Sequence, residues 1–412
     1  MRPPSDFHTS GIAPGDLGLL ISGNVVSTLG NAVYLIAVTL LLKEMTESAL
    51  MLGLFQFVAL APGFLLSPVI GVVVDRVARH RIIVLSDLYR AVLMILAGLA
   101  LMVPALRIPS VILVVAFLAG IGHALFIPAV HALLPGIVPP ERLQTATGLR
   151  AAGSQAANLA GNAVGGALYV LLGGPVLFVL NGLSFLASAV QELFIRGGRE
   201  APDPGDRRSS HFTMARVGLT TVVRDRPLRS LLLSQAGLFL VSPVLVIALP
   251  FLVIDDLGMP EAALGGYLAL AVAGGIVAFV LLRLLPLHAL LRKQLPGVAY
   301  FGLAGAFAAV GLAPGPLVLA VVAVVSGYAA GLVYLVAVTW IQVRCDSGLH
   351  GRIFAVMEAG NSALAPTGYL FAGILLELLG AEYRWVLFVV VAAAAFLRGL
   401  VLVRDRPRSP QG

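Results

Sequence analysis

The sequence has few charged residues for its length and only one cysteine. Asp, Glu, Lys and Arg make up 11% of the 412 residues, whereas a soluble domain has roughly 25%. Hydrophobic residues reach 59%, and the mean hydropathy is +0.99. These values exclude an ordinary soluble domain and indicate a polytopic membrane protein. The single Cys345 excludes a disulfide within the chain.

Several chemical signatures are also missing. The sequence has no nucleotide-binding glycine loop, no metal-spaced Cys and His cluster and no Ser-His-Asp pattern, so we expect no enzyme activity, cofactor or metal. Residues Met1 to Asp16 lack the apolar core of a cleavable signal peptide, and we expect the first membrane helix to direct insertion. The formal charge of +7 would indicate a nucleic-acid partner in a soluble protein. Here the basic residues fit the loops between membrane spans, so we expect no nucleic-acid partner.

A membrane span needs about 20 mainly apolar residues, and the chain holds two sets of six such segments. The first set predicts helices at 17–42, 49–74, 82–103, 110–134, 146–172 and 175–195. The second set predicts helices at 230–254, 262–285, 296–313, 317–341, 353–379 and 385–403. We therefore expect an all-α membrane protein with an N-terminal six-helix bundle at 1–195 and a C-terminal six-helix bundle with a short tail at 230–412.

The polar stretch 196–229 separates the two sets and predicts a cytoplasmic linker. Its second part, 214–229, has the pattern of an amphipathic helix on the membrane surface. Most Lys and Arg residues fall in this linker, in the other even-numbered connections and in the tails, whereas Lys43, Arg107 and Arg384 fall in odd-numbered connections. Because basic residues collect on the cytoplasmic side, we expect both termini in the cytoplasm.

The two sets also resemble each other in sequence. The segments 150–166 and 357–373 align without a gap and match Gly153 with Gly360, Gly161 with Gly368 and Gly166 with Gly373. Small residues are common in packed membrane helices, so chance similarity is an alternative. Six spans on each side of a long linker favour duplication, and such repeats place a substrate site between the halves near the bilayer midplane.

The connection between the second and third predicted helices carries a distinctive motif. Gly71, Asp75, Arg76, Arg79 and Arg81 have the spacing of the gate signature of the major facilitator superfamily, and the chain resembles that family. The resemblance implies that the glycine lets the second helix approach the eleventh, that the aspartate faces the eleventh helix's N-terminus, and that the arginines latch a cytoplasmic gate. An ordinary positive-inside loop is the alternative, but it explains only the arginines.

Other segments resemble the macrolide and enterobactin exporters of that superfamily. They include 27–53, the DLYRA run at 87–91, and Pro128 with Ala129. Exporters of this branch commonly have Asp where this chain has Asn31, which removes one usual protonation candidate. The resemblance implies transport of a small molecule.

The first predicted helix carries a polar stripe, and the fifth carries a glycine motif. Asn24, Ser27, Thr28, Asn31 and Tyr34 share one helical face, which predicts either a cavity lining or hydrogen bonds between helices. The glycine motif resembles the superfamily's antiporter signature, although Asn162 stands where Pro is usual, and helix packing is its alternative. The motif consists of Gly148, Gly161, Asn162, Gly165 and Gly166.

Few ionisable groups fall within the predicted helices. Asp87 and Arg90 are three residues apart and predict an ion pair that steadies the gate, with proton transfer as the alternative. Glu358 is the first candidate for a proton-coupling group, because a carboxyl group in a membrane can exchange a proton. His123 is the second, with a hydrogen-bonded structural histidine as its alternative.

The sequence as a whole predicts a monomeric secondary transporter in the bacterial cytoplasmic membrane. We expect it to export an amphipathic or lipophilic organic molecule by alternating access, as a proton antiporter in contact with membrane lipids. A lipid or lysophospholipid transporter and a receptor that does not transport are the alternatives. We expect few charged residues in the cavity, and most of its predicted residues are aromatic. The predicted cavity residues are Asn24, Asn31, Tyr34, Phe126, Phe239, Phe251, Tyr328, Tyr334 and Asn361.

Overall fold

A computed structural model describes residues 15–199, 219–284, 289–345 and 347–404. The first half is helical throughout, with short 3-10 turns in two of its connections. Its helices are α1 (Asp16–Thr46), α2 (Ala49–Leu65), α3 (Ser67–Arg76), α4 (Arg79–Leu101), α5 (Pro109–Ile137), α6 (Leu143–Leu172) and α7 (Gly174–Leu193).

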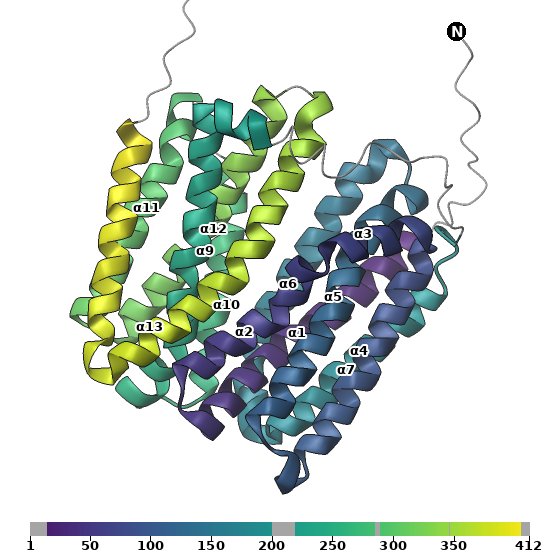
Figure 1. The fold of residues 1–412 in the computed structure, drawn as a ribbon, viewed down its shortest axis with the longest axis horizontal. Helices are drawn as coiled ribbons and strands as arrows, with labels where there is room; N and C mark the ends of the chain where they lie inside the picture. Colours follow the sequence, from purple (N-terminus) through teal and green to yellow (C-terminus); the bar gives the residue numbers. More distant parts are fainter. Residues whose placement is uncertain (1–14, 200–218, 285–288, 346, 405–412) are drawn as a thin grey trace, which may run out of the picture.

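The second half is also helical in the part that the structure describes. Its helices are α9 (Arg226–Phe251), a π-helical turn η4 (Leu252–Asp256), α10 (Ala262–Leu284), α11 (Ala289–Leu312), α12 (Pro316–Arg344) and α13 (Ser347–Arg404). Most of the predicted linker lies outside the described residues, but 219–224 are helical and lead into α9. Figure 1 shows the two halves side by side, with the earlier half in purple to blue and the later half in teal to yellow.

The expected twelve spans are present with two differences in detail. Nine described helices are long and apolar enough to cross a membrane, and the bent pair α2 and α3 adds a tenth span. The 58 residues of α13 form two spans, because Gly380 takes a left-handed φ of 66° that a helix cannot contain. The thirty-residue α6, which is less apolar, completes the twelve.

The second span is broken where the sequence predicts one straight helix. α2 and α3 meet at Leu66 with a bend of 55°. Pro62 lies inside α2 and Pro68 lies in the first turn of α3. Neither proline can donate a backbone hydrogen bond, so the helical ladder is interrupted on both sides of Leu66.

The matched glycines of the two repeats make matched contacts. A Cβ atom at Gly161 would lie 2.8 Å from the backbone oxygen of Leu29 on α1, and a Cβ atom at Gly368 would lie closer still to the backbone oxygen of Phe239 on α9. Gly166 packs against α10 of the other half, and Gly373 packs against α2 of the other half. Equivalent helices therefore occupy equivalent places, as a duplicated fold requires.

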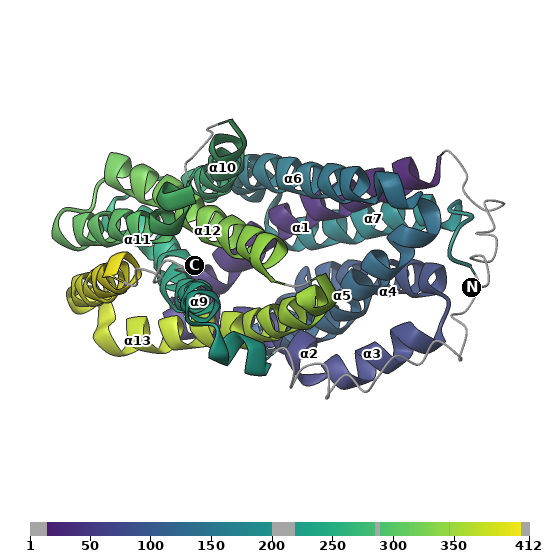
Figure 2. The ribbon, with the colours of Figure 1, turned by 90° about the horizontal axis from the view of Figure 1, so that it is seen from above.

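The hydrophobic core joins the halves at one end of the molecule. We call the end where α1 begins and α7 ends the linker end, and the end where α1 finishes the opposite end. One large cluster of buried side chains includes residues from both halves, such as Leu40 and Leu245. Two smaller clusters, one around Ile83 and one around Ile353, lie within single halves toward the linker end. Figure 2 shows α2 and α13 side by side where the halves meet.

Candidate functional site

A cavity of about 310 Å³ lies among the helices of the first half. Its wall is mainly apolar, with aromatic rings from Tyr34, Phe55 and Phe185 and the side chain of Met94. The polar lining residues come from α1, α2, α4, α5 and α6: Asn31, Gln56, Arg90, His123, Asn158 and Asn162. A mostly apolar wall with a few polar groups is typical of small-molecule sites.

Arg90 is the buried cation in the wall of this cavity. Its guanidinium forms an ion pair with Asp87, one turn earlier on α4. The guanidinium also lies over two aromatic rings, 4.7 Å from the centre of Phe126 and 4.3 Å from the centre of Phe185. Such cation–π contacts hold a desolvated guanidinium in place. These contacts hold Arg90 in the cavity wall in this conformation, with its charge balanced by Asp87.

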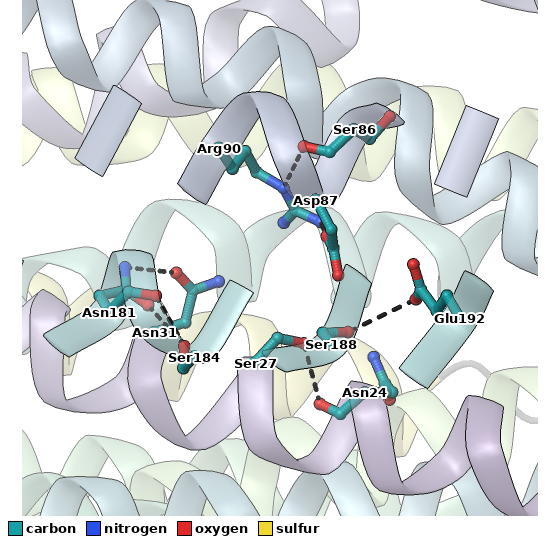
Figure 3. A network of polar contacts seen from close by, with 10 residues as sticks. All are labelled: Asn24, Ser27, Asn31, Ser86, Asp87, Arg90, Asn181, Ser184, Ser188 and Glu192. Carbon is teal, nitrogen blue, oxygen red and sulfur yellow. Dashed lines mark hydrogen bonds and ion pairs between the residues drawn. The ribbon is translucent and has the colours of Figure 1, made fainter. Parts of the chain in front are cut away.

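Glu192 lies near this pair and was missed in the sequence analysis. It lies at the end of α7 with 0% of its surface exposed, and Ser188 donates a hydrogen bond to its Oε1 at 3.4 Å. Figure 3 shows the Asp87 side chain extending from α4 toward Ser188, with Glu192 beside that serine. The sequence contains a pattern that could have indicated Glu192, because a polar stripe runs along one face of α7. The stripe consists of Asn181, Ser184, Ser188 and Glu192.

The polar stripe on α1 serves both of its expected purposes. Asn24 is buried and its Oδ1 accepts a hydrogen bond at 2.7 Å from Ser154 on α6, which joins the two helices. Asn31 lines the cavity, and its Oδ1 accepts a hydrogen bond from Asn181 on α7 at 3.3 Å. The stripe thus changes from packing to cavity lining along α1.

The gate motif lies at the linker end, in α3 and at the start of α4. Asp75, Arg76 and Arg81 are exposed at the linker end, and a Cβ atom at Gly71 would meet no atom within 4 Å. His80, which lies between Arg79 and Arg81 of the motif, is buried, and its Nε2 donates to the backbone oxygen of Glu192 at 2.9 Å.

Comparison with known proteins identifies the family. A family model described as Major Facilitator Superfamily matches residues 20–315. The chain belongs to the major facilitator superfamily. An uncharacterized MFS-type transporter, y4rN of Sinorhizobium fredii (strain NBRC 101917 / NGR234), is 26% identical over 402 residues, which are 96% of this chain and 95% of that protein.

Two further similarities concern an efflux protein and a solved structure. Macrolide efflux protein A of Streptococcus pyogenes is 28% identical over 192 residues, which are 46% of this chain and 45% of that protein. The crystal structure of the nucleoside transporter NupG has a TM-score of 0.71 and 9% sequence identity over 94% of this chain and 98% of that chain. The latter similarity concerns the fold. The protein is a multi-pass membrane transporter of this superfamily.

The expected cavity residues of this major facilitator transporter are distributed over several places. Asn31 and Tyr34 line the cavity of the first half, whereas Phe126 packs against Arg90. Phe251 lines a second cavity at the opposite end. Asn24, which bonds to Ser154 on α6, lines neither cavity. Four predicted residues of the second half also lie outside both of these described cavities: Phe239, Tyr328, Tyr334 and Asn361.

The two proton-coupling candidates of this transporter lie in different halves. His123 lines the cavity beside Arg90. Glu358 lies on α13, and its side chain is exposed. Asn361, one turn further along α13, accepts a hydrogen bond from Gln235 on α9 at 3.3 Å.

The glycine motif on α6 is mostly a packing surface of the transporter. Gly161 and Gly165 pack against α1, and Gly166 packs against Ala262 of α10. Asn162 lines the cavity, and a Cβ atom at Gly148 would meet no atom within 4 Å. Close helix approach therefore accounts for three of the four glycines.

Polar contacts connect the halves of the transporter at the opposite end. Lys43 on α1 forms an ion pair with Asp255 of the second half, with 2.6 Å between Nζ and Oδ1. Glu377 on α13 accepts hydrogen bonds from Ser48 Oγ at 3.0 Å and from the backbone nitrogen of Leu50 at 3.2 Å. A carboxylate is favourable at this place, because the first turn of α2 presents unpaired N–H groups and a positive dipole end.

Replacing Glu377 with alanine is expected to weaken the closure of the opposite end. The carboxylate caps a helix of the other half from an exposed position, so its loss costs about 1 kcal/mol, or roughly a fivefold change in the ratio of the two conformations. Labelling of a cysteine placed at Ala381, in a Cys345→Ser background, measures access to this end. Glu382→Ala, an exposed neighbour, is the control. Equal labelling of both variants would contradict a role for Glu377.

Proposed function

We propose that the protein is a secondary active transporter that exports an amphipathic or lipophilic organic small molecule by alternating access, with proton antiport as the driving reaction. The observation that carries this proposal is the cavity of the first half, in a molecule whose halves join at the opposite end. Alternating access requires two conformations, each closed at a different end. The hydrophobic core includes both halves at the opposite end, whereas each half has its own cluster at the linker end. This arrangement supports alternating access.

The orientation that we propose places the linker end in the cytoplasm of a bacterium, with both termini on that side. The excess of basic residues in the linker and the even-numbered connections supports it. In this orientation, the conformation described here faces the cytoplasm, where an exporter binds its cargo. Gly71, Asp75 and the arginines of the motif then form the gate that closes the linker end in the other conformation.

The cavity wall suggests the chemistry of the cargo. Its aromatic and aliphatic side chains favour a lipophilic molecule, and its amide groups can bind carbonyl or hydroxyl groups on that molecule. The charge of Arg90 is already balanced by Asp87, so the wall offers no uncompensated cation for an anionic cargo. The partial similarity to macrolide efflux protein A supports cargo of this class.

Everted membrane vesicles with an acidic interior test the proposal. We expect uphill accumulation of at least one lipophilic compound from a drug and metabolite panel, and its loss when a protonophore removes the gradient. Ala119 lines the cavity, so Ala119→Trp should fill it and abolish accumulation, whereas Ala393→Trp, on an exposed face of α13, should not. Movement of lipid alone would favour a lipid transporter, and absence of any saturable transport would favour a receptor.

A further inference from the structure

Asp87, Arg90 and Glu192 form a buried cluster whose charges do not cancel. Their exposed fractions are 0%, 3% and 0%. With all three groups ionised, the cluster carries a net charge of −1 inside a membrane protein. An uncompensated buried charge is costly, so one proton or another cation must accompany the cluster.

Two oxygen atoms of the cluster are free to take that proton. Asp87 Oδ2 and Glu192 Oε2 are buried and have no hydrogen-bond partner among the described residues. Asp87 Oδ1 is occupied by the guanidinium of Arg90, and Glu192 Oε1 is occupied by Ser188. Within the described part of the chain, Glu192 has no ion pair comparable with that of Asp87, so its carboxyl group is the better proton acceptor.

The other ionisable groups around α7 do not balance this charge. Asp16 on α1 accepts the backbone N–H groups of Arg196 and Gly197 at 3.0 and 2.8 Å. Arg199 donates to the backbone oxygens of Ile195 and Leu193 at 3.0 Å. Both groups are therefore engaged with the chain that follows α7.

Two histidines lie on the other sides of the cluster. The imidazole of His80 on α4 donates to the backbone oxygen of Glu192, not to its carboxylate. The imidazole of His123 on α5 lies on the cavity side of Arg90. Among the described residues, the side-chain cation that acts on both carboxyl groups is therefore Arg90.

We propose that Glu192, acting with Asp87 and Arg90, is the proton-binding site that couples the cavity to the proton gradient. The inference rests on the proposed function for its coupling step, although the proton site itself does not depend on the cargo. Glu192 Oε2 takes one proton from water and becomes a neutral carboxylic acid, which leaves the Asp87 and Arg90 pair balanced. Release of that proton to water restores the carboxylate, which then competes with Asp87 for the guanidinium.

Arg90 connects this proton site to the cargo cavity. Its guanidinium lies over the rings of Phe126 and Phe185, and Arg90 forms part of the cavity wall. A change in the electrostatic attraction between the carboxylates and the guanidinium therefore changes the position of Arg90 in the wall that cargo contacts. By linkage, cargo that alters the position of Arg90 alters proton binding at Glu192 to the same extent.

Infrared difference spectroscopy of the purified, full-length protein tests the proton site without any cargo. The C=O stretch of a protonated carboxyl group is separate from the carboxylate bands, and wild type should show one such band that a pH change removes. Glu192→Gln should lose this band, because the remaining Asp87 and Arg90 pair is neutral. Asp87→Asn should lose it for the same reason, which keeps the test valid if one variant does not fold. Glu382→Gln, at an exposed position, is the control and should keep it.

A transport measurement then tests whether proton binding at Glu192 drives cargo movement. In everted vesicles, Glu192→Gln should lose pH-driven accumulation and keep downhill exchange of cargo. Retention of both the band and the accumulation by Glu192→Gln would overturn the inference, as would loss of both in Glu358→Gln alone. If no cargo is transported but the band depends on Glu192 as stated, the proposed function fails and the proton site stands.

Discussion

An Arg90→Met variant is expected to lose about 3–5 kcal/mol of stability, because the substitution leaves the buried carboxylate of Asp87 without its counter-charge. Methionine keeps much of the side chain's length and its contact with the aromatic rings, so the loss reports charge more than volume. The measurement is the midpoint of thermal unfolding of the purified protein in detergent, followed by the loss of the monodisperse fraction. The yield of folded protein from membranes should fall in parallel.

A triple variant separates charge from packing in this experiment. Arg90→Met combined with Asp87→Asn and Glu192→Gln carries no charge in the cluster, and it should recover most of the lost stability. A replaced buried ion cluster is often no less stable than the original, whereas a broken one is much less stable. If Arg90→Met alone unfolds at the wild-type temperature, the cluster is not the buried network described here.

A Gly53→Val variant is expected to shift the protein strongly toward the conformation that is open at the opposite end. A Cβ atom at Gly53 would lie 2.5 Å from the backbone oxygen of Tyr369 and 3.0 Å from the Cα atom of Gly373. Overpacking of this kind costs about 1–3 kcal/mol, or roughly a fivefold to hundredfold change in the ratio of conformations. The cost applies only where α2 and α13 touch, so it falls on one conformation.

Two other glycines of the same span provide the comparison. Gly63→Val should have no effect, because the site has no atom within 4 Å. Gly71→Val should shift the balance in the other direction if Gly71 meets the eleventh helix when the linker end closes. In a Cys345→Ser background, spin labels at the exposed Leu106 and Leu312 measure the distance between the halves at the opposite end. An unchanged distance in Gly53→Val would contradict the closure that we describe.

The fold could be predicted from the sequence because its main signals are local. Long apolar segments define the spans, and the alignment of Gly161 with Gly368 indicates the repeat before any contact is known. The break at Leu66 was missed, although Pro62 and Pro68 mark it, because hydropathy is continuous through the segment. Prolines in a membrane helix do not always bend it, since neighbouring groups can satisfy the freed backbone atoms.

The candidate site was harder to predict, because it depends on how each helix is rotated about its axis. Asn24 and Asn31 share a stripe on α1, yet one joins two helices and the other lines a cavity. Glu192 was overlooked because it lies near the end of a span, where an acidic residue is usually exposed. Its burial follows from the close packing of α7 against α4 and α1, which no local pattern reveals.

The most direct test of the account counts protons and cargo in the same vesicles. Purified protein is reconstituted into liposomes loaded with the transported compound and a pH-sensitive dye, at equal internal and external pH and with the membrane potential clamped. Proton antiport predicts that the interior acidifies as the cargo leaves, and that Glu192→Gln releases cargo without acidification. Cargo release from the wild-type protein with no change in internal pH would contradict proton antiport.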